Sequence, residues 1–246
     1  MYKLGLIGKN ISYSFSRAYF KKKFETDHIT HVSYENFDIE NISLFPEVIK
    51  NTKGLKGLNV TIPYKEAVIP YLDKLNKKAK QIGAVNTVKI TKKNKLIGYN
   101  TDYYGFKKAL TPFLKPHHKN ALILGTGGAS KAIAFSLKKL NINYDYVSRN
   151  ASKGIKFTYD TLTEDIIKTH QIIINSTPLG TFPDVTLCPN IPYNGITNKH
   201  ILFDLIYNPE ETTFLKKGKE KGATIINGLN MLRLQAEKAW SIWKIY

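Results

Sequence analysis

Short apolar segments alternate with helix-like segments along the chain of 246 residues, and this alternation is the strongest constraint on its fold. Apolar runs such as Ala121–Leu124 and Ile172–Ile174 have the length of buried strands. Strands separated by helices favour parallel sheets that are covered on both faces, so we expect an α/β fold. The segments 86–91 and 95–98 flank a short turn at 92–94 and predict a hairpin.

Two alternating units follow each other, separated by a break between Pro112 and His118. The other expected strands are 3–8, 31–37, 57–61, 121–125, 144–148, 171–176, 201–205 and 223–227. The expected helices are 16–24, 44–50, 75–82, 102–113, 129–140, 163–169, 212–221 and 229–243. The intervening loop 178–198 has a length that is typical of functional or mobile loops.

The composition is strongly basic, with 37 Lys and Arg against 19 Asp and Glu and a formal net charge of +18. The cations are spread over many helices and turns, as at 77–80, 92–95 and 216–221. A nucleic-acid site would need clustered cations, so a solvated basic surface that can steer small anions is favoured. The single cysteine, Cys188, excludes an internal disulfide and a cysteine-based metal site.

The same sequence predicts the setting of the protein. No apolar run approaches the roughly 20 residues of a membrane helix. Residues 1–8 have the pattern of a first strand and lack the apolar segment and cleavage site of a signal peptide. We therefore expect a cytoplasmic protein that acts on a small molecule, as a monomer or homodimer, with no metal, nucleic-acid or membrane partner.

A strand, a glycine turn and a helix follow each other at 121–132, with the turn at Gly125-Thr126-Gly127-Gly128. Gly125 permits a tight turn, and Gly127 lets backbone N–H groups approach a pyrophosphate at the helix N-terminus. Ser130 replaces the third glycine of the usual dinucleotide pattern, so an ordinary tight turn is the alternative. The small residues Gly128, Ala129 and Ser130 still allow close packing of helix on strand.

The end of the next strand distinguishes between the two nicotinamide dinucleotides. Sites for NAD place an acidic residue there, whereas sites for NADP place an arginine near the 2′-phosphate. This strand ends in Ser148-Arg149-Asn150 and offers no acid. Arg149 has the permanent charge and forked donors that suit a phosphate, so NADP is favoured, with a plain surface arginine as the alternative.

Several motifs outside the glycine turn are difficult to explain by packing alone. They are Ser14-Phe15-Ser16, Asn59-Val60-Thr61-Ile62-Pro63-Tyr64-Lys65, Gly83-Ala84-Val85-Asn86-Thr87 and Gly98-Tyr99-Asn100-Thr101-Asp102-Tyr103-Tyr104-Gly105. Together with the glycine turn they resemble the motifs of the shikimate dehydrogenase family. The resemblance continues in Ile174–Gly180, in the segment from Asp204 to Thr212, and in Gly228–Ala236, so it covers nearly the whole chain.

This resemblance implies an architecture and a reaction. It implies an N-terminal α/β substrate domain over 1–103, a Rossmann-like doubly wound NADP-binding domain over 104–227, and a C-terminal helix, 228–246, that returns to the first domain. The family reaction is the reversible reduction of 3-dehydroshikimate to shikimate by NADPH, a step toward chorismate and the aromatic amino acids.

Lys65 and Asp102 are the catalytic pair to which the resemblance points. Hydride addition to a carbonyl leaves an alkoxide, and a positioned lysine can supply its proton while an acid beside the lysine orients it. In a lysine-rich chain, Lys65 alone would be interpreted as a surface residue. Asp102 alone would be interpreted as the N-cap of the helix that follows it.

The remaining site residues are assigned by the same resemblance. Ser14 and Ser16 are expected to bind the substrate carboxylate, with the Tyr207 hydroxyl close to it. The residues expected to bind the ring hydroxyls are Asn59, Thr61, Asn86 and Gln235. The residues expected to bind the cofactor are Gly125, Thr126, Gly127, Gly128, Ala129, Ser148, Arg149, Thr177, Leu205, Gly228 and Met231, the last with Gly228 at the nicotinamide end.

The sequence also departs from the family in two places. The family loop after the second nucleotide-domain strand often has Asn-Arg-Thr where this chain has Ser148-Arg149-Asn150. Residues 149–163 are short for the family, which predicts the loss of a helix. Two alternatives remain: a quinate/shikimate enzyme that uses NAD, and a basic nucleic-acid-binding protein that reuses a nucleotide fold.

Overall fold

The computed structural model describes residues 1–12, 14–152 and 154–244. The chain divides into two compact units. Unit 1 contains Met1–Thr101 together with Gln235–Tyr246, and unit 2 contains Asp102–Leu234. The C-terminal segment of the chain therefore packs with the N-terminal unit. Among the described helices, none is long and apolar enough to cross a membrane.

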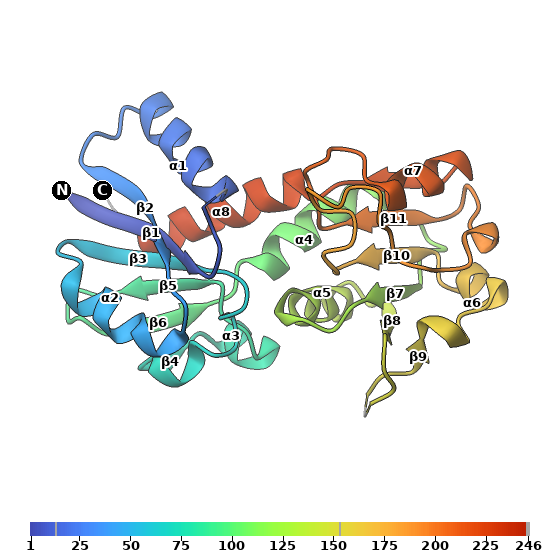
Figure 1. Cartoon of the computed structure of the whole chain (residues 1–246), viewed down its shortest axis with the longest axis horizontal. Coiled ribbons are helices and arrows are strands. Elements are labelled where there is room, and N and C mark those ends of the chain that lie inside the picture. Colours follow the sequence, from blue (N-terminus) through green and yellow to red (C-terminus); the bar gives the residue numbers. More distant parts are fainter. Residues whose placement is uncertain (13, 153, 245–246) are drawn as a thin grey trace. The chain divides into compact units, whose positions relative to one another are not determined.

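Unit 1 is built on a six-stranded mixed sheet with the strand order β2-β1-β3-β5-β6-β4 (Figure 1). Its strands are β1 (Tyr2–Gly8), β2 (Val32–Asp38), β3 (Leu55–Val60), β4 (Lys74–Leu75), β5 (Thr87–Ile90) and β6 (Leu96–Tyr99). Strands β1, β2 and β3 are parallel, whereas β5 runs antiparallel to both β3 and β6. The predicted hairpin is confirmed, and its β5 strand is why this sheet is mixed instead of wholly parallel.

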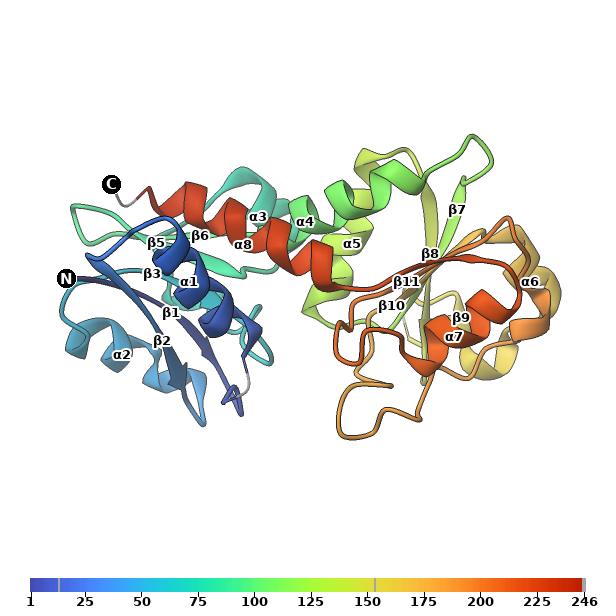
Figure 2. The same ribbon diagram turned by 90° about the horizontal axis from the view of Figure 1, so that it is seen from above.

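Helices cover both faces of the unit 1 sheet. They are α1 (Phe15–Thr26), α2 (Phe45–Asn51), α3 (Lys77–Ile82) and the C-terminal part of α8 (Leu229–Trp243). Alternate residues of β1 face opposite ways, because Leu4 and Leu6 pack with α1 and α8 while Ile7 packs with α2. Helices α1 and α8 lie side by side on one face, where the rings of Phe20 and Trp243 are 5.6 Å apart (Figure 2).

Unit 2 contains a six-stranded sheet in which every pairing is parallel, with the order β12-β11-β10-β7-β8-β9. Its strands are β7 (Asn120–Leu124), β8 (Asn143–Ser148), β9 (Phe157–Thr158), β10 (Ile172–Asn175), β11 (Ile201–Asp204) and β12 (Thr224–Ile226). Counted from β7, this is the 3-2-1-4-5-6 order of the Rossmann fold. The strand order reverses between β7 and β10, which is where such sheets bind ligands.

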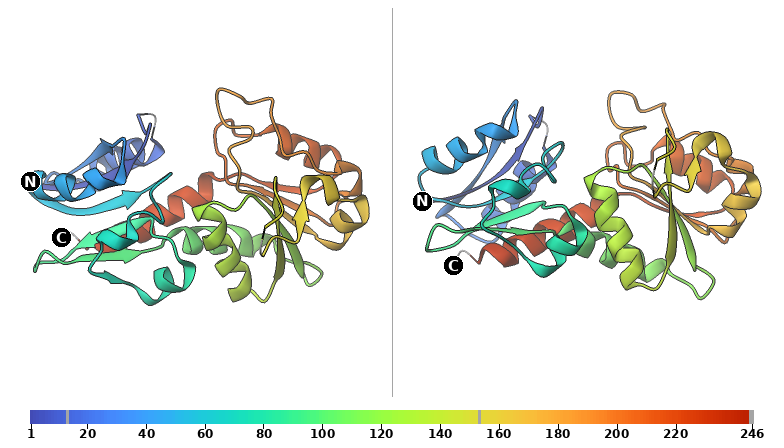
Figure 3. Two further views of the ribbon diagram at one scale, coloured as in Figure 1. Left: turned by 60° about the horizontal axis from the view of Figure 1, so that its bottom comes forward. Right: turned by 90° about the horizontal axis from the view of Figure 1, so that it is seen from below.

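Both faces of this sheet are covered, as Figure 3 shows. The helices are α4 (Asp102–Leu110), α5 (Gly128–Lys139), α6 (Glu164–Thr169) and α7 (Thr213–Glu220). Helices α4 and α5 pack on one face, where Phe106 and Ile133 meet Ile123. Helices α6 and α7 pack on the other, where Ile167 and Phe214 meet Leu122. The unit is therefore doubly wound, as the sequence predicts.

Two details differ from the prediction, and a third agrees with it. The expected helix 75–82 is shorter, because Asn76 caps α3 by accepting a hydrogen bond from Lys78 N and leaves β4 before it. The expected helix 102–113 ends at Leu110, where Pro112 lies in a 3-10 turn. In the described part of 149–163 there is no α-helix, in agreement with the predicted loss, and β9 forms the sheet edge instead.

The side chain of Trp243 joins α8 to the unit 1 sheet, and its removal provides a test of this packing. Trp243 is 3% exposed, and its indole N–H donates to the Val88 carbonyl at 2.9 Å. We expect Trp243→Ala to lower the free energy of unfolding by about 3–5 kcal/mol, the range for truncated aromatic core residues. Urea unfolding measures this, with the exposed Arg233→Ala on the same helix as control. Equal stability of the two variants would contradict the packing role.

Candidate active site

Three predicted substrate residues of unit 1 lie in one buried hydrogen-bonded cluster. Asn59 is the penultimate residue of β3, Asn86 precedes β5, and Gln235 lies on α8. Asn59 Nδ2 donates to the Asn86 carbonyl at 3.2 Å, and Asn86 Nδ2 donates to Gln235 Oε1 at 3.3 Å. The exposed fractions are 4%, 3% and 6%. Residues far apart in the sequence are therefore brought together, as expected of a site that recognises hydroxyl groups.

The orientation of these amides follows from partners whose roles are unambiguous. A backbone N–H can only donate, and Thr101 N lies 2.6 Å from Asn86 Oδ1. A backbone carbonyl can only accept, so the atom of Asn59 that faces the Asn86 carbonyl is Nδ2. The hydroxyls of Thr87 and Thr101 complete the cluster by bonding Asn86 Oδ1 and Gln235 Oε1 at 3.1 and 3.2 Å.

Tyr34 extends this cluster toward the predicted carboxylate-binding serines, and it was not among the predicted site residues. Its hydroxyl donates to Asn59 Oδ1 at 2.8 Å. Burial raises the pKa of the Tyr34 phenol, and a hydrogen bond from Ser16 opposes that rise. Ser14 caps α1, because its Oγ accepts from Ser16 N at 3.2 Å. Ser14 and Ser16 thus lie at a helix N-terminus, a position that favours a negatively charged group.

The catalytic lysine proposed from the sequence lies close to the same cluster along the chain. Lys65 is half-buried, and its carbonyl accepts from Val85 N at 2.7 Å, which ties it to the segment that carries Asn86. Thr61 is half-buried, and its N–H donates to Ile7 O. Asp102 is 6% exposed and is the first residue of α4. The interpretation of Asp102 as the N-cap is therefore wrong by one residue, because the N-cap is the residue just before the helix. The catalytic roles of Lys65 and Asp102 stay predictions.

The glycine turn of unit 2 has the geometry of an anion site. Gly125 has φ +100°, and a Cβ there would come within 3.0 Å of Ser176 Oγ, so a side chain would be strained. Gly127 is the N-cap of α5 and offers no side chain to satisfy the helix N–H groups. The space above Gly127 is open to 4 Å. Free N–H groups at a helix N-terminus with room above them fit a pyrophosphate.

Ser130 fills the place of the third glycine without disturbing the turn. Its side chain is 1% exposed, and its Oγ donates to the Gly127 carbonyl at 2.6 Å. Its backbone N–H donates to the same carbonyl at 2.9 Å. The hydroxyl therefore finds a partner within the turn, and the departure from the strict glycine pattern costs no buried polar group.

Most of the predicted cofactor residues follow the carboxyl ends of parallel strands. The register pairs Leu124 of β7 with Val147 of β8 and with Asn175 of β10. The residues that come next are therefore at one sheet edge: Gly125, Thr126, Ser148, Arg149, Ser176, Thr177 and Leu205. Arg149 is exposed, so its guanidinium group is accessible to a ligand. Thr177 is held in place, because its Oγ1 donates to Asn175 Oδ1 at 2.6 Å.

A buried carboxylate supports the loops at this edge. Asp204 ends β11 and is fully buried. It accepts from Thr212 Oγ1 at 2.6 Å, from Ile206 N at 3.0 Å and from Asn175 Nδ2 at 3.1 Å. Burial raises the pKa of Asp204 to about 6, although these three hydrogen bonds oppose the rise. Asp204 thereby fixes β10, β11 and α7, and its role is structural.

The last predicted cofactor residues lie at the start of α8. A Cβ on Gly228 would lie 2.0 Å from the Leu205 carbonyl oxygen, so only glycine allows this approach. Leu205 and Tyr207 are half-buried. Met231 is 6% exposed and packs in the hydrophobic core of unit 2. The structure thus places Met231 in the core, and its contact with the nicotinamide stays a prediction.

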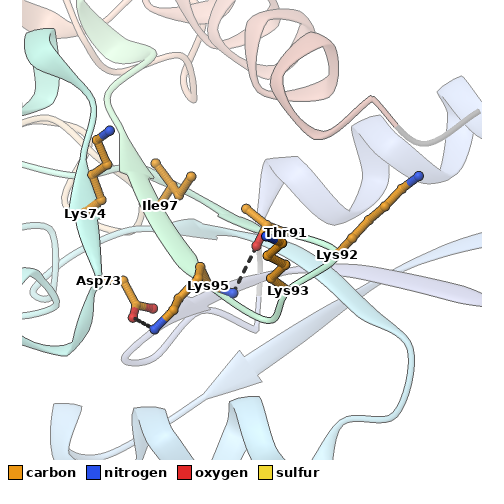
Figure 4. A pocket seen from close by; sticks show the side chains of 7 residues that line it. All are labelled: Asp73, Lys74, Thr91, Lys92, Lys93, Lys95 and Ile97. Atoms are coloured by element: carbon orange, nitrogen blue, oxygen red, sulfur yellow. Dashed lines mark hydrogen bonds and ion pairs between the residues drawn. The ribbon is translucent and has the colours of Figure 1, made fainter.

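Figure 4 shows a separate concave surface at the turn between β5 and β6. Its described lining consists of Asp73, Lys74, Thr91, Lys92, Lys93, Lys95 and Ile97. Lys95 Nζ pairs with Asp73 Oδ1 at 2.8 Å, and Lys95 N donates to Thr91 Oγ1 at 3.0 Å. This surface contains none of the predicted site residues, and we assign the site to the polar cluster and the glycine turn instead.

Two residues of the site were part of the sequence motifs but were not predicted as site residues. Thr87 and Thr101 each belong to one of the motifs, and both are fully buried in the cluster. In both motifs the threonine directly follows an asparagine, and this pairing is the sequence signal that could have indicated their role. Tyr34 gave no such signal, because an aromatic residue in an alternating strand is expected in any core.

Comparison with known proteins gives concordant results. Residues 6–88 match the model of a shikimate dehydrogenase substrate binding domain. A shikimate dehydrogenase (NADP(+)) of Methanococcus vannielii is 41% identical over 98% of this chain and 90% of its own. One of Clostridium botulinum is 39% identical over 99% and 96%. The Thermus thermophilus shikimate 5-dehydrogenase in complex with NADP(H) and shikimate has 29% identity, 99% and 94% coverage and a TM-score of 0.87.

The carboxyl of Asp204 predicts a pH dependence of stability. Burial raises its pKa from 3.8 to about 6, so the folded protein binds this proton more tightly than the unfolded chain does. Its contribution to the free energy of unfolding therefore decreases as the pH rises from about 4 to about 6, by up to roughly 3 kcal/mol. We expect Asp204→Asn to gain stability relative to the unsubstituted protein across this window, measured by urea unfolding. A difference that is constant with pH would contradict the raised pKa.

Proposed function

Because the chain belongs to the shikimate dehydrogenase family, we propose that it catalyses the reversible reduction of 3-dehydroshikimate to shikimate with NADPH. The observation that carries this proposal is the similarity to curated NADP-dependent shikimate dehydrogenases over 98% of the chain, since it includes both units. The product leads to chorismate and the aromatic amino acids. The enzyme acts in the cytoplasm on a small molecule, as a monomer or homodimer, and needs no nucleic acid, membrane or metal.

The polar cluster of unit 1 suits a substrate that carries several hydroxyls. The hydrogen bonds of the described residues use only the Oε1 end of Gln235. Its Nε2 donors are therefore available to a ring hydroxyl, and the Asn86 amide beside it is held in one orientation. Buried polar groups that lose their partner are costly, so such a site rejects analogues that lack a hydroxyl. Ser14 and Ser16 at the start of α1 receive the carboxylate.

The cofactor side of the proposal rests on unit 2. The turn from Gly125 to Gly128 and the N-terminus of α5 hold the pyrophosphate, and Ala129 lies in the first turn of that helix. Arg149, with Ser148 before it, receives the 2′-phosphate and selects NADP over NAD. Thr177, Leu205, Gly228 and Met231 line the remainder of the cofactor site.

The protein supplies the proton of the reaction. Bound NADPH supplies the hydride that adds to the carbonyl carbon. The ammonium group of Lys65 donates a proton to the oxygen as its negative charge develops, so that a hydroxyl forms in place of an alkoxide. The Asp102 carboxylate orients the Lys65 ammonium group, and the neutral amine left after the transfer takes up a proton from solvent. In the direction of shikimate oxidation, the neutral Lys65 amine takes the proton from the hydroxyl.

Replacement of Lys65 tests the catalytic role. We expect Lys65→Ala to lower kcat by about 10²–10⁴-fold, because this is the usual contribution of a positioned acid–base group. Oxidation of shikimate, followed by NADPH absorbance, gives kcat. The exposed Lys77→Ala is the control, since it removes the same charge from the surface. A Lys65→Ala enzyme as fast as this control would contradict the assignment.

Replacement of Arg149 tests the choice of cofactor. A hydrogen-bonded charge pair is worth about 1.5–3 kcal/mol, so Arg149→Gln is expected to raise KM for NADP by about 10–100-fold. KM for NAD, which lacks the 2′-phosphate, should change little. Lys139→Gln, at the far end of α5, is the matched control. A preference of the unsubstituted enzyme for NAD, or a quinate activity above that for shikimate, would favour the alternative enzyme of the same family.

A further inference from the structure

We propose that Tyr34 is a positioning residue for the substrate, whose hydroxyl holds Asn59 in the orientation that the site requires. This inference rests on the proposed function. Neither the motifs nor the comparisons assign Tyr34 a role. It lies on β2, a strand that carries none of the predicted substrate residues.

The ring of Tyr34 is fixed by packing. Tyr34 is 8% exposed and stacks on Phe20 of α1, with the ring centroids 4.5 Å apart and the planes at 15°. Trp243 of α8 lies against the same pair, at 6.5 Å from the Tyr34 ring. A phenylalanine would keep these contacts, so the contribution of the hydroxyl can be separated from that of the ring.

The hydroxyl begins a chain of donors that has only one direction. Tyr34 donates to Asn59 Oδ1 at 2.8 Å, and Asn59 Nδ2 donates to Thr87 Oγ1 at 3.3 Å. Thr87 then donates to Asn86 Oδ1 at 3.1 Å, and Asn86 donates onward to Gln235 Oε1 at 3.3 Å. The chain ends on the oxygen of Gln235, whose Nε2 donors take part in none of the hydrogen bonds of the described residues. Tyr34 therefore acts on the substrate through Asn59 and not by contact.

The hydrogen bonds of Asn59 leave it little capacity for a direct contact with substrate. Both of its Nδ2 protons are used, by the Asn86 carbonyl and by Thr87 Oγ1. Its Oδ1 accepts from Tyr34. Asn59 is thus better described as the link between Tyr34 and Asn86 than as a ligand of the ring hydroxyls.

The Tyr34 hydroxyl also lies beside Ser16 of the predicted carboxylate subsite. Burial raises the pKa of the phenol, which keeps its proton on at neutral pH, while Ser16 lowers the pKa in part. With its own proton donated to Asn59, the phenol oxygen can still accept a hydrogen bond.

Replacement of this one hydroxyl tests the inference. In Tyr34→Phe we expect KM for shikimate to rise about tenfold, the value of one buried hydrogen bond. KM for NADP should stay unchanged. The preference for shikimate over an analogue that lacks one ring hydroxyl should fall as well, because Asn59 loses the partner of its Oδ1 and the donor chain that leads to Gln235 loses its first link. A merely structural loss would change neither KM nor this preference.

Tyr193→Phe is the matched control. Tyr193 is a partly buried tyrosine of unit 2 whose hydroxyl donates to the Pro189 carbonyl at 2.8 Å. Tyr193→Phe removes the same chemical group at a position in unit 2, far along the chain from the polar cluster of unit 1. We expect a similar decrease in Tm for both variants and a rise in KM only for Tyr34→Phe.

Thr87 provides a second route to the same result if Tyr34→Phe folds poorly. Thr87→Val breaks the donor chain between Asn59 and Asn86 and is expected to raise KM for shikimate in the same way. Thr87→Ser keeps the hydroxyl and should restore the KM of the unsubstituted enzyme to within about twofold.

The outcomes separate this inference from the proposed function. If the unsubstituted protein oxidises shikimate and Tyr34→Phe has the same KM and the same discrimination, the inference is wrong and the proposed function stands. If the unsubstituted protein does not oxidise shikimate with NADP or NAD, the proposed function fails, and the inference fails with it.

Discussion

The 2.6 Å hydrogen bond from Thr101 N to Asn86 Oδ1 is the interaction on which the organisation of unit 1 depends. It sets the direction of the Asn86 amide, because a backbone N–H cannot accept. The bonds of Asn86 to Thr87 and Gln235 then follow, and with them the attachment of α8 to the sheet. In a buried cluster each polar atom must find a partner, so one fixed donor propagates its orientation to every neighbour.

In unit 2, a buried group with several hydrogen bonds holds loops in place instead of a polar cluster. Its parallel strands bring loops from separate parts of the chain to one edge, where their backbone would otherwise be free to move. The Asp204 carboxylate accepts hydrogen bonds from β10, from the segment after β11 and from the N-cap of α7, at the cost of burying a charge. The glycine turn lies at the same edge and needs that support, because an anion site works only when its N–H groups are held in place.

The sequence predicts most of this structure, for identifiable reasons. Short apolar runs such as Ile172–Ile174 favour buried strands, and a glycine turn between such a run and a helix-like segment is typical of a dinucleotide-binding fold, so the second unit was predictable nearly element by element. Positions such as Asn59 and Asn86 were predicted through a resemblance. The role of Tyr34 was not predictable, because its hydroxyl has meaning only after β2, β3 and α8 are assembled. The core position of Met231 has the same explanation, since both a core and a cofactor face favour methionine.

The serine at position 130 has a consequence for how such folds are detected. A strict three-glycine signature would reject this chain, although its turn is intact. The third position requires only a side chain small enough for the helix to approach the strand, and a hydroxyl that reaches back to the Gly127 carbonyl meets that requirement. The signature is better expressed as a limit on side-chain volume at that position than as an amino-acid identity.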